Sequence, residues 1–257
     1  MHDDLLFYNA YEDFYRMAGA SPAFRAYCRE AFGADFSQDG FSDLWQVQQI
    51  LPYIPKEKEA HVMDIGCGNG KMVAYLGQQT GAFVHGFDYS TQAIQTARAL
   101  FPERSDFQVG LIGQQEYPEG SFDVVTSMDT LYFAPDMEGF VGQVKRWLKP
   151  GGVFFVGYQE GDVIPRTAGW EDSRLAAALR TNDWAAQVTD ITHQTWELLR
   201  RKQQAALHHR EAFLQEEQEQ WFELLMQQTD CAMDTYEAFA KDYARYLVAA
   251  RKEIPKE

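Results

Sequence analysis

From residue 61 onward, short apolar runs alternate with segments whose apolar residues recur at helical spacing. Runs of this length suit buried strands, and each is followed by turn residues or by an amphipathic segment. Strands separated by helices form parallel βαβ units, because two parallel strands need a crossover between them. The alternation therefore predicts an α/β fold, with a doubly wound sheet and helices on both faces. The predicted strands are HVMDI, AFVHGFD, DFQVG, FDVVTSM and VFFVGY.

The segments on either side of this alternation are mostly helical in pattern. Before it, three helices are expected; the second begins at Ser21-Pro22, with serine as N-cap and proline in the first turn. The third is expected over SDLWQVQQILPYI. After the fifth strand, DSRLAAALRTN predicts a helix and WAAQVTDIT a strand. From His193 to about Gln228, apolar residues at spacings near three, four and seven predict one long helix.

These patterns divide the 257 residues into four regions. A chain of this length fits one compact domain with additions, or two small domains. The tail YARYLVAAR has an apolar, strand-like centre and is expected to close the sheet. The expected regions are an N-terminal helical cover over 1–60, an α/β core over 61–192, a helical insertion or cap over 193–242, and the last strand with the tail over 243–257.

Composition excludes several classes of protein. The net charge of −15 disfavours nucleic-acid partners, which are bound through Lys and Arg. The start of the chain has no basic, apolar leader and no run approaches the length of a membrane span, so no membrane association is expected. Three scattered cysteines indicate a reducing, cytoplasmic setting. No metal site is expected either, because His208 and His209 would point in different directions on a helix.

The stretch DIGCGNG, at residues 64–70, stands between the first predicted strand and its helix. Its glycines suit a backbone that passes close to a ligand. A dinucleotide-binding loop would place its third glycine at position 71, which is Lys71, so the spacing weakens that interpretation. A phosphate-binding P-loop would need a hydroxyl where Met72 stands. A tight turn without a ligand is the remaining alternative.

Asp88 ends the second predicted strand, 18 residues after Gly70. In doubly wound sheets ligands bind at the carboxyl ends of the strands, where a carboxylate can accept hydrogen bonds from both ribose hydroxyls. The alternative is a charge at a helix N-terminus, next to Ser90. Together, the glycine loop and Asp88 favour an adenosine-containing ligand.

Two later motifs, EGSFDVVTSM and LKPGGVFFV, complete a pattern. With DIGCGNG and Asp88, they resemble the class I S-adenosylmethionine-dependent methyltransferases, in the small-molecule branch. The resemblance covers residues 61–158, and more weakly 170–192 and 243–252. It implies a Rossmann-like, mostly parallel sheet of seven strands, and a cytoplasmic enzyme, monomer or homodimer. Such an enzyme transfers a methyl group from S-adenosyl-L-methionine to a nitrogen or oxygen of a small molecule by in-line displacement, and releases S-adenosyl-L-homocysteine.

The resemblance also implies which residues hold the cofactor. Backbone amides of the loop would meet its methionine carboxylate, Asp64 would orient the loop, and Asp88 would take the ribose. Many members carry an acid for the adenine amino group where this chain has Leu111, so adenine would be held by apolar packing. The full implied set is Asp64, Gly66, Cys67, Gly68, Gly70, Asp88, Tyr89, Leu111, Ile112 and Met128.

A general base is needed only when the attacking group is protonated, since positioning supplies much of the catalysis. The candidates are expected on loops at the carboxyl ends of strands, Asp129 and Tyr132 after the fourth strand and Tyr158 after the fifth; each is equally an ordinary loop residue. Tyr11 and Tyr15 would cover the methyl donor or pack into the core. Gln38 and Asp39 would join such a cover.

Two other functions remain open at this point. One is a non-catalytic S-adenosylmethionine-binding protein that acts through contact with a partner. The other is an NAD-dependent oxidoreductase on a similar sheet, which Lys71 at the third glycine position disfavours.

Overall fold

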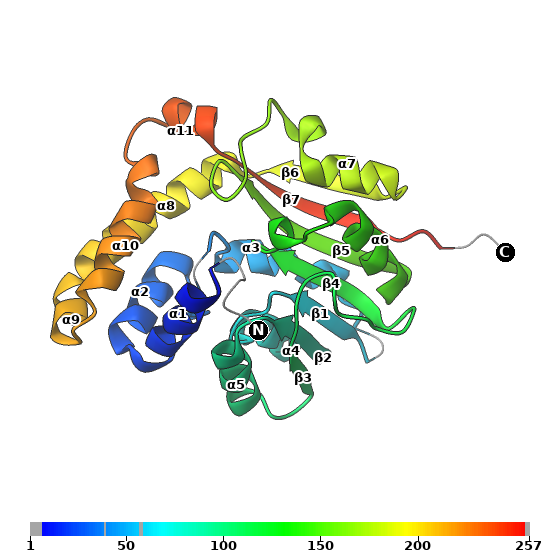
Figure 1. The fold of residues 1–257 in the computed structure, drawn as a ribbon, viewed down its shortest axis with the longest axis horizontal. Helices are drawn as coiled ribbons and strands as arrows, with labels where there is room; N and C mark the ends of the chain where they lie inside the picture. Colours follow the sequence, from blue (N-terminus) through cyan, green and yellow to red (C-terminus); the bar gives the residue numbers. More distant parts are fainter. Residues whose placement is uncertain (1–6, 39, 57–58, 255–257) are drawn as a thin grey trace.

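The computed structural model describes residues 7–38, 40–56 and 59–254. Its sheet has seven strands in the order β3-β2-β1-β4-β5-β7-β6 (Figure 1). Paired strands are parallel, except that β7 runs antiparallel to both β5 and β6. This confirms the expected sheet. The strands are β1 (His61–Ile65), β2 (Phe83–Asp88), β3 (Ser105–Val109), β4 (Phe122–Met128), β5 (Leu148–Glu160), β6 (Ala185–Asp190) and β7 (Ala244–Arg251).

Helices cover both faces of the sheet, as the alternation predicts. Successive residues of β1 point to opposite faces, so Met63 packs in the cluster with α6 and α7 and Val62 packs in the cluster with α3, α4 and α5. Both side chains are fully buried. The covering helices are α6 (Met137–Trp147) and α7 (Arg174–Thr181) on one face, and α3 (Leu44–Gln48), α4 (Lys71–Thr80) and α5 (Thr91–Leu100) on the other.

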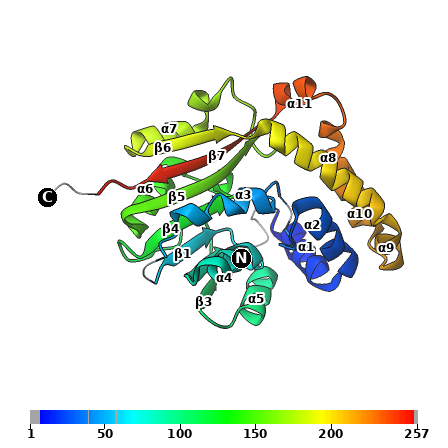
Figure 2. The ribbon, with the colours of Figure 1, turned by 180° about the vertical axis from the view of Figure 1, so that it is seen from behind.

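The remaining helices form a cap built from both ends of the chain. Phe24 of α2 shares one apolar cluster with Leu198 of α8, Phe213 of α9 and Leu225 of α10. Figures 1 and 2 show the helices from the two ends side by side, beyond the edge of the sheet. The helices of the cap are α1 (Tyr8–Ala20), α2 (Pro22–Phe32), α8 (Thr192–His208), α9 (Arg210–Gln215), α10 (Glu219–Thr229) and α11 (Tyr236–Asp242).

Local capping signals lie where the sequence places them. The Ser21 hydroxyl accepts a hydrogen bond from the Phe24 amide at 2.9 Å, and Ser90 accepts one from Ala93 at 3.0 Å. The third N-terminal helix is divided, however. It is the short α3, followed by a single 3-10 turn over Leu51–Tyr53 that contains Pro52. A proline lacks the amide that a continuing helix needs.

The prediction of one long helix from His193 to Gln228 is wrong. The chain leaves helical geometry at His209, with φ −93° and ψ 8°, and again at Glu217, with φ +58°. The two breaks let α9 and α10 fold back toward α8, so that Phe213 and Leu225 reach the apolar core of the cap. Burial of these side chains decides the path, although the segment contains no glycine or proline.

Three further 3-10 turns connect these elements: Leu131–Phe133, Trp170–Asp172 and Asp230–Ala232. Among the helices in the part of the chain that the structure describes, none is long and apolar enough to cross a membrane.

Candidate functional site

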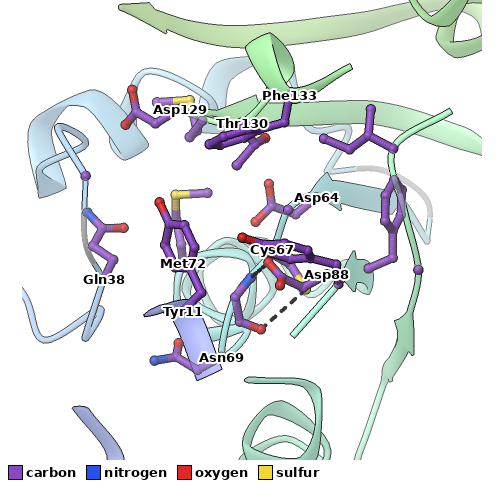
Figure 3. A pocket seen from close by; sticks show the side chains of 18 of the residues that line it. Tyr11, Gln38, Asp64, Cys67, Asn69, Met72, Asp88, Asp129, Thr130 and Phe133 are labelled. Carbon is purple, nitrogen blue, oxygen red and sulfur yellow. Dashed lines mark hydrogen bonds between the residues drawn. The ribbon is translucent and has the colours of Figure 1, made fainter. Parts of the chain in front are cut away.

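A cavity of about 230 Å³ lies at the carboxyl ends of β1, β2 and β4. β1 is the central strand from which the connections lead in both directions, which is where doubly wound sheets bind ligands. Figure 3 shows Asp64, Asp88 and Tyr11 arranged around this space. The implied cofactor-binding residues that line it are Asp64, Gly66, Cys67, Gly68, Asp88, Tyr89, Leu111, Ile112 and Met128.

At its glycines, the loop between β1 and α4 approaches its neighbours too closely to carry a side chain. Gly66 and Gly68 have φ values of +70° and +53°. A Cβ at Gly66 would lie 2.4 Å from a Thr130 carbon, and one at Gly68 would lie 2.3 Å from the Tyr15 hydroxyl. Gly70 differs, because it caps α4 against Phe107 and does not line the cavity. The loop therefore presents bare backbone at Gly66 and Gly68, while Cys67 and Asn69 also line the cavity.

Asp88 connects this loop to the start of α5. Its Oδ2 accepts a hydrogen bond from the Gly68 amide at 2.9 Å, and its Oδ1 accepts one from the Ser90 amide at 2.8 Å. Burial raises the pKa of Asp88 to about 6. A carboxylate has about four acceptor positions, so two amides leave room for two hydroxyl donors from the cavity. The sequence left two roles open for Asp88, a ligand-binding acid or a charge at a helix N-terminus. In the structure Asp88 both contacts the start of α5 and faces the cavity.

Asp64, in β1, has one satisfied oxygen and one free oxygen. Oδ1 accepts a hydrogen bond from the Thr126 hydroxyl at 2.7 Å. Oδ2 is buried and has no hydrogen-bond partner among the described residues. Burial, with the nearby charge of Asp88, raises the pKa of Asp64 to about 7. A buried oxygen without a partner in the cavity wall suits a ligand that carries a cation or donor.

Asp129 follows β4 and lines the cavity, but its carboxylate is already paired. It forms a bidentate ion pair with Arg245 and also accepts hydrogen bonds from the Phe41 amide and the Ser42 hydroxyl, at 3.2 and 2.9 Å. The guanidinium and the two further donors therefore occupy both carboxylate oxygens. This geometry argues against Asp129 as a general base.

The two tyrosines proposed after strands lie outside the cavity wall. Tyr132 is in the 3-10 turn after β4, packed against the sheet core, and burial raises its pKa well above the usual value. Tyr158 lies within β5 rather than after it, because β5 continues to Glu160 beside β7. Its side chain is fully buried, with the Trp170 ring 6.5 Å away. Neither tyrosine lines the cavity.

The aromatic side chains of α1 divide between two environments. Phe14 is buried in the cap core, whereas Tyr11 and Tyr15 line the cavity with stacked rings 6.3 Å apart. Tyr11 also packs edge-on against Tyr89, at 6.0 Å. Gln38 lines the cavity too, while Asp39 lies outside the described residues. Helix α1 therefore contributes side chains both to the core of the cap and to the wall of the cavity.

Several residues of the site were not foreseen from the sequence. The Asn69 amide donates to the Ser37 carbonyl at 3.0 Å, and Lys71 Nζ donates to the Ser37 hydroxyl at 2.7 Å. The glycine loop is thus fastened to the cover segment. Asn69 and Lys71 flank Gly70 of the motif, and this position is the one feature of the sequence that could have indicated their role. Other unforeseen lining residues are Phe36, Met72, Gln114, Thr130, Phe133 and Pro135.

Comparison with known proteins agrees with this geometry. Residues 63–156 match the family model described as a methyltransferase domain. The matched residues run from β1 into β5, so the α/β core has the fold of a methyltransferase domain. A sterol 24-C-methyltransferase from Gibberella zeae is 29% identical over 193 residues, which are 73% of this chain and 49% of that protein. The chain spans about half the length, or less, of the curated relatives it matches.

Solved structures share the fold at lower identity. Phosphoethanolamine N-methyltransferase 2 from Haemonchus contortus, solved with phosphomonomethylethanolamine and S-adenosylhomocysteine, has a TM-score of 0.74 and 19% identity, covering 95% of this chain and 60% of that chain. A cyclopropane synthase from Mycobacterium tuberculosis has a TM-score of 0.71 and 16% identity, covering 94% and 98%. At these identities the likeness concerns the fold alone.

Proposed function

We propose that this chain transfers a methyl group from S-adenosylmethionine to a nitrogen or oxygen of a small molecule. The observation that supports this most directly is the hydrogen bond between the Gly68 amide and Asp88. It joins the bare loop after β1 to the carboxylate at the end of β2, on one wall of one cavity. A nucleoside with an amino-acid tail would contact both groups at once.

The charges of the cavity suit the two ends of such a cofactor. The two acceptor positions left on Asp88 match the two ribose hydroxyls. Asp64 Oδ2, buried and without a partner among the described residues, suits the ammonium of the methionine part. The start of α4 would receive its carboxylate. The amides of the loop glycines and of Cys67 already donate within the protein, so the loop does not supply these donors. Adenine would lie against Tyr89, Leu111 and Ile112, with Met128 near the methionine part.

Methyl transfer needs positioning more than acid–base groups. When bound, S-adenosylmethionine would supply its methyl carbon to the nucleophile's lone pair, the carbon–sulfur bond pair would return to sulfur, and S-adenosylhomocysteine would remain, neutral at sulfur. The attacking nitrogen or oxygen then loses its proton to solvent. Tyr11 and Tyr15 line the cavity and would attract the sulfonium through their rings. Because Asp129 is paired with Arg245, we propose that the chain acts by alignment and water exclusion.

The acceptor is proposed to be a small molecule rather than a nucleic acid. The net charge of −15 repels phosphate backbones. The proposal includes a cytoplasmic location and a monomer or homodimer. Among the named relatives are enzymes that act on sterol carbon and on phosphoethanolamine nitrogen, which supports small acceptors as a class.

The test separates binding from turnover. The full chain is titrated with S-adenosylmethionine, S-adenosylhomocysteine and NAD⁺ by calorimetry, and is then incubated with methyl-labelled donor and a panel of small amines, phenols, sterols and phosphoethanolamine. We expect one cofactor bound per chain, no NAD⁺ binding, and label transferred to a member of the panel. Tight binding of NAD⁺ would overturn the proposal. Cofactor binding without transfer to any acceptor would instead favour the non-catalytic alternative.

A further inference from the structure

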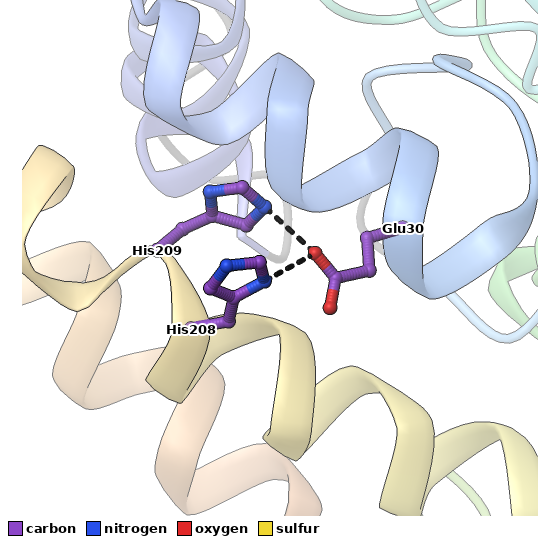
Figure 4. A group of neighbouring side chains, drawn as sticks. All are labelled: Glu30, His208 and His209. Atoms are coloured by element: carbon purple, nitrogen blue, oxygen red, sulfur yellow. Dashed lines mark hydrogen bonds and ion pairs between the residues drawn. The ribbon is translucent and has the colours of Figure 1, made fainter.

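A second cluster of chemically active side chains lies in the cap, away from the cavity. It consists of Glu30 on α2, His208 at the end of α8, and His209 at the junction with α9. The Glu30 Oε2 atom is 2.8 Å from His208 Nδ1 and 3.0 Å from His209 Nε2 (Figure 4). Two imidazoles and a carboxylate therefore converge on one point.

This convergence differs from the expectation that adjacent histidines point apart. α8 ends at His208, and His209 leaves helical geometry with φ −93° and ψ 8°. The two rings are consequently stacked, with centroids 4.8 Å apart and planes 26° apart. The break that brings α9 back toward α2 is the same break that aligns the two rings.

The distances are close to those of a coordination shell. Zinc takes nitrogen and carboxylate oxygen at roughly 2.0–2.2 Å, which places tetrahedral ligand atoms about 3.3 Å apart. The two measured separations are 2.8 and 3.0 Å, and the three ligand atoms all lie within 4.8 Å of one another. Small rotations of these side chains would open the space for an ion. The side chains of His208 and Glu30 are 69% and 40% exposed, so their rotations meet little packing, whereas His209, at 20%, is held more firmly.

The neighbouring cations do not occupy this point. Arg29, beside Glu30, lies 3.8 Å from Asp35 in an ion pair. Arg210, beside His209, pairs with Glu211 at 3.2 Å and lies over the Phe222 ring. Each of these two guanidinium groups thus pairs with another carboxylate, and Glu30 contacts the two imidazoles.

We propose that Glu30, His208 and His209 form a binding site for a divalent transition-metal ion, with Zn²⁺ as the best match. The three ligands leave a fourth position to solvent, because the site is at the surface. Imidazole nitrogen with one carboxylate favours zinc over the oxygen-preferring Mg²⁺ and Ca²⁺. The ion would join α2, from the N-terminal cover, to the α8–α9 junction, from the C-terminal insertion. It would stabilise the cap by binding only the folded arrangement.

The experiment uses the full chain after chelator treatment, without any cofactor present. Zn²⁺ is titrated by calorimetry into the parent chain and into Glu30→Gln, His208→Ala and a double variant, Glu30→Gln with His208→Ala. His193→Ala is the matched control, because His193 is also exposed and lies 3.8 Å from a carboxylate, that of Glu197, on the same helix. The folded state of each variant is checked by circular dichroism.

We expect one Zn²⁺ per parent chain, a melting temperature that rises with Zn²⁺, and at least tenfold weaker binding in each single ligand variant. His193→Ala should bind as the parent does. Equal affinity in the parent and the double variant would overturn the proposal, as would loss of binding in His193→Ala. Co²⁺ gives a second measurement, since a visible spectrum of low-coordinate cobalt should appear in the parent and vanish in the double variant. None of these readouts involves methyl transfer, so their failure would leave the proposed function untouched.

Discussion

Arg245 of β7 and Asp129, directly after β4, form a bidentate ion pair, although 116 residues separate them in the chain. The arginine is fully buried. Its Nε donates to Gln46 Oε1 at 3.0 Å, and one Nη donates to the Ser42 hydroxyl at 2.9 Å. Three parts of the chain meet here: the end of β4, the last strand, and the segment from Ser42 into α3. Arg245 therefore fastens the N-terminal cover beside the cavity.

Arg245→Met should destabilise the fold strongly, because it leaves the carboxylate of Asp129, whose side chain is only 9% exposed, without its counter-charge. Breaking a buried pair from one side costs about 3–5 kcal/mol in the free energy of unfolding. The measurement is urea denaturation. Affinity for S-adenosylhomocysteine should also fall, since Ser42 and Gln46 lose their partner.

Arg251→Met provides the control for this change. Arg251 is on the same strand but exposed, and its guanidinium donates to the Gly151 carbonyl at 2.7 Å. A surface substitution of this kind is expected to change stability by about 0.5 kcal/mol or less. If the two variants lost equal stability, the fastening role of Arg245 would be refuted.

Much of the fold could be predicted from the sequence because its signals are local. Strand–helix alternation and the capping serines Ser21 and Ser90 act within a few residues, and both caps form as expected. The breaks at His209 and Glu217 could not be predicted in the same way. They carry neither glycine nor proline, and the reason for them is burial of Phe213 and Leu225 against helices that lie far away in the sequence.

The same distinction applies to the site. The glycine loop and Asp88 are recognisable because each ends a strand at a fixed spacing. Asp129 lines the cavity directly after β4, but its partner Arg245 is distant in sequence. The local signal for Arg245 is a charge near the start of β7, ahead of the apolar centre of the strand. Tyr158 was misplaced because pairing with β7 extends β5 to Glu160, two residues past the expected end.

Asp88→Ala should weaken binding of S-adenosylhomocysteine without unfolding the chain. The change removes an acceptor for ribose hydroxyls, and hydrogen bonds to a charged group contribute about 1.5–3 kcal/mol. Calorimetry should therefore show a dissociation constant higher by roughly 10- to 150-fold. Asp106→Ala is the matched control, because Asp106 is an exposed acid on the adjacent strand β3, bonded to Gln108 at 2.9 Å. Unchanged affinity in Asp88→Ala would remove the ribose assignment.

Gly66→Ala should abolish cofactor binding, and Gly120→Ala should not. Both glycines have left-handed φ values, +70° and +68°, so both variants share a conformational cost of about 1–2 kcal/mol. A Cβ at Gly120 meets nothing within 4 Å, whereas at Gly66 it would lie 2.4 Å from a Thr130 carbon.

The comparison isolates the steric effect from the backbone effect. Thr130 cannot move away freely, because its hydroxyl donates to the Ile65 carbonyl at 2.7 Å. Overpacking adds about 1–3 kcal/mol, so Gly66→Ala should be the less stable variant in urea by that difference. Equal stabilities, with equal cofactor affinities, would mean that the loop has more room than the structure gives it.

Binding of S-adenosylhomocysteine should strengthen as pH rises toward 7. Burial raises the pKa of Asp64 from 3.8 to about 7, so the ligand-free folded chain holds this proton below that pH. Because the folded-state pKa of Asp64 lies above the unfolded value, the contribution of this one group to stability is greatest below about pH 4 and is lost as pH rises to about 7. The ammonium of the ligand favours the ionised carboxylate, so binding releases the proton.

Calorimetry between pH 5.5 and 8, in two buffers of different ionisation enthalpy, measures this release directly. We expect up to about one proton released near pH 6 from Asp64 and a flat affinity above its pKa, because the group is then already ionised. Asp88, with its pKa raised to about 6, adds to the slope at the acid end. Asp64→Asn should bind more weakly and lose most of the pH dependence between 6 and 7. Proton uptake on binding, or an undiminished slope in Asp64→Asn, would show that the ammonium does not meet Asp64.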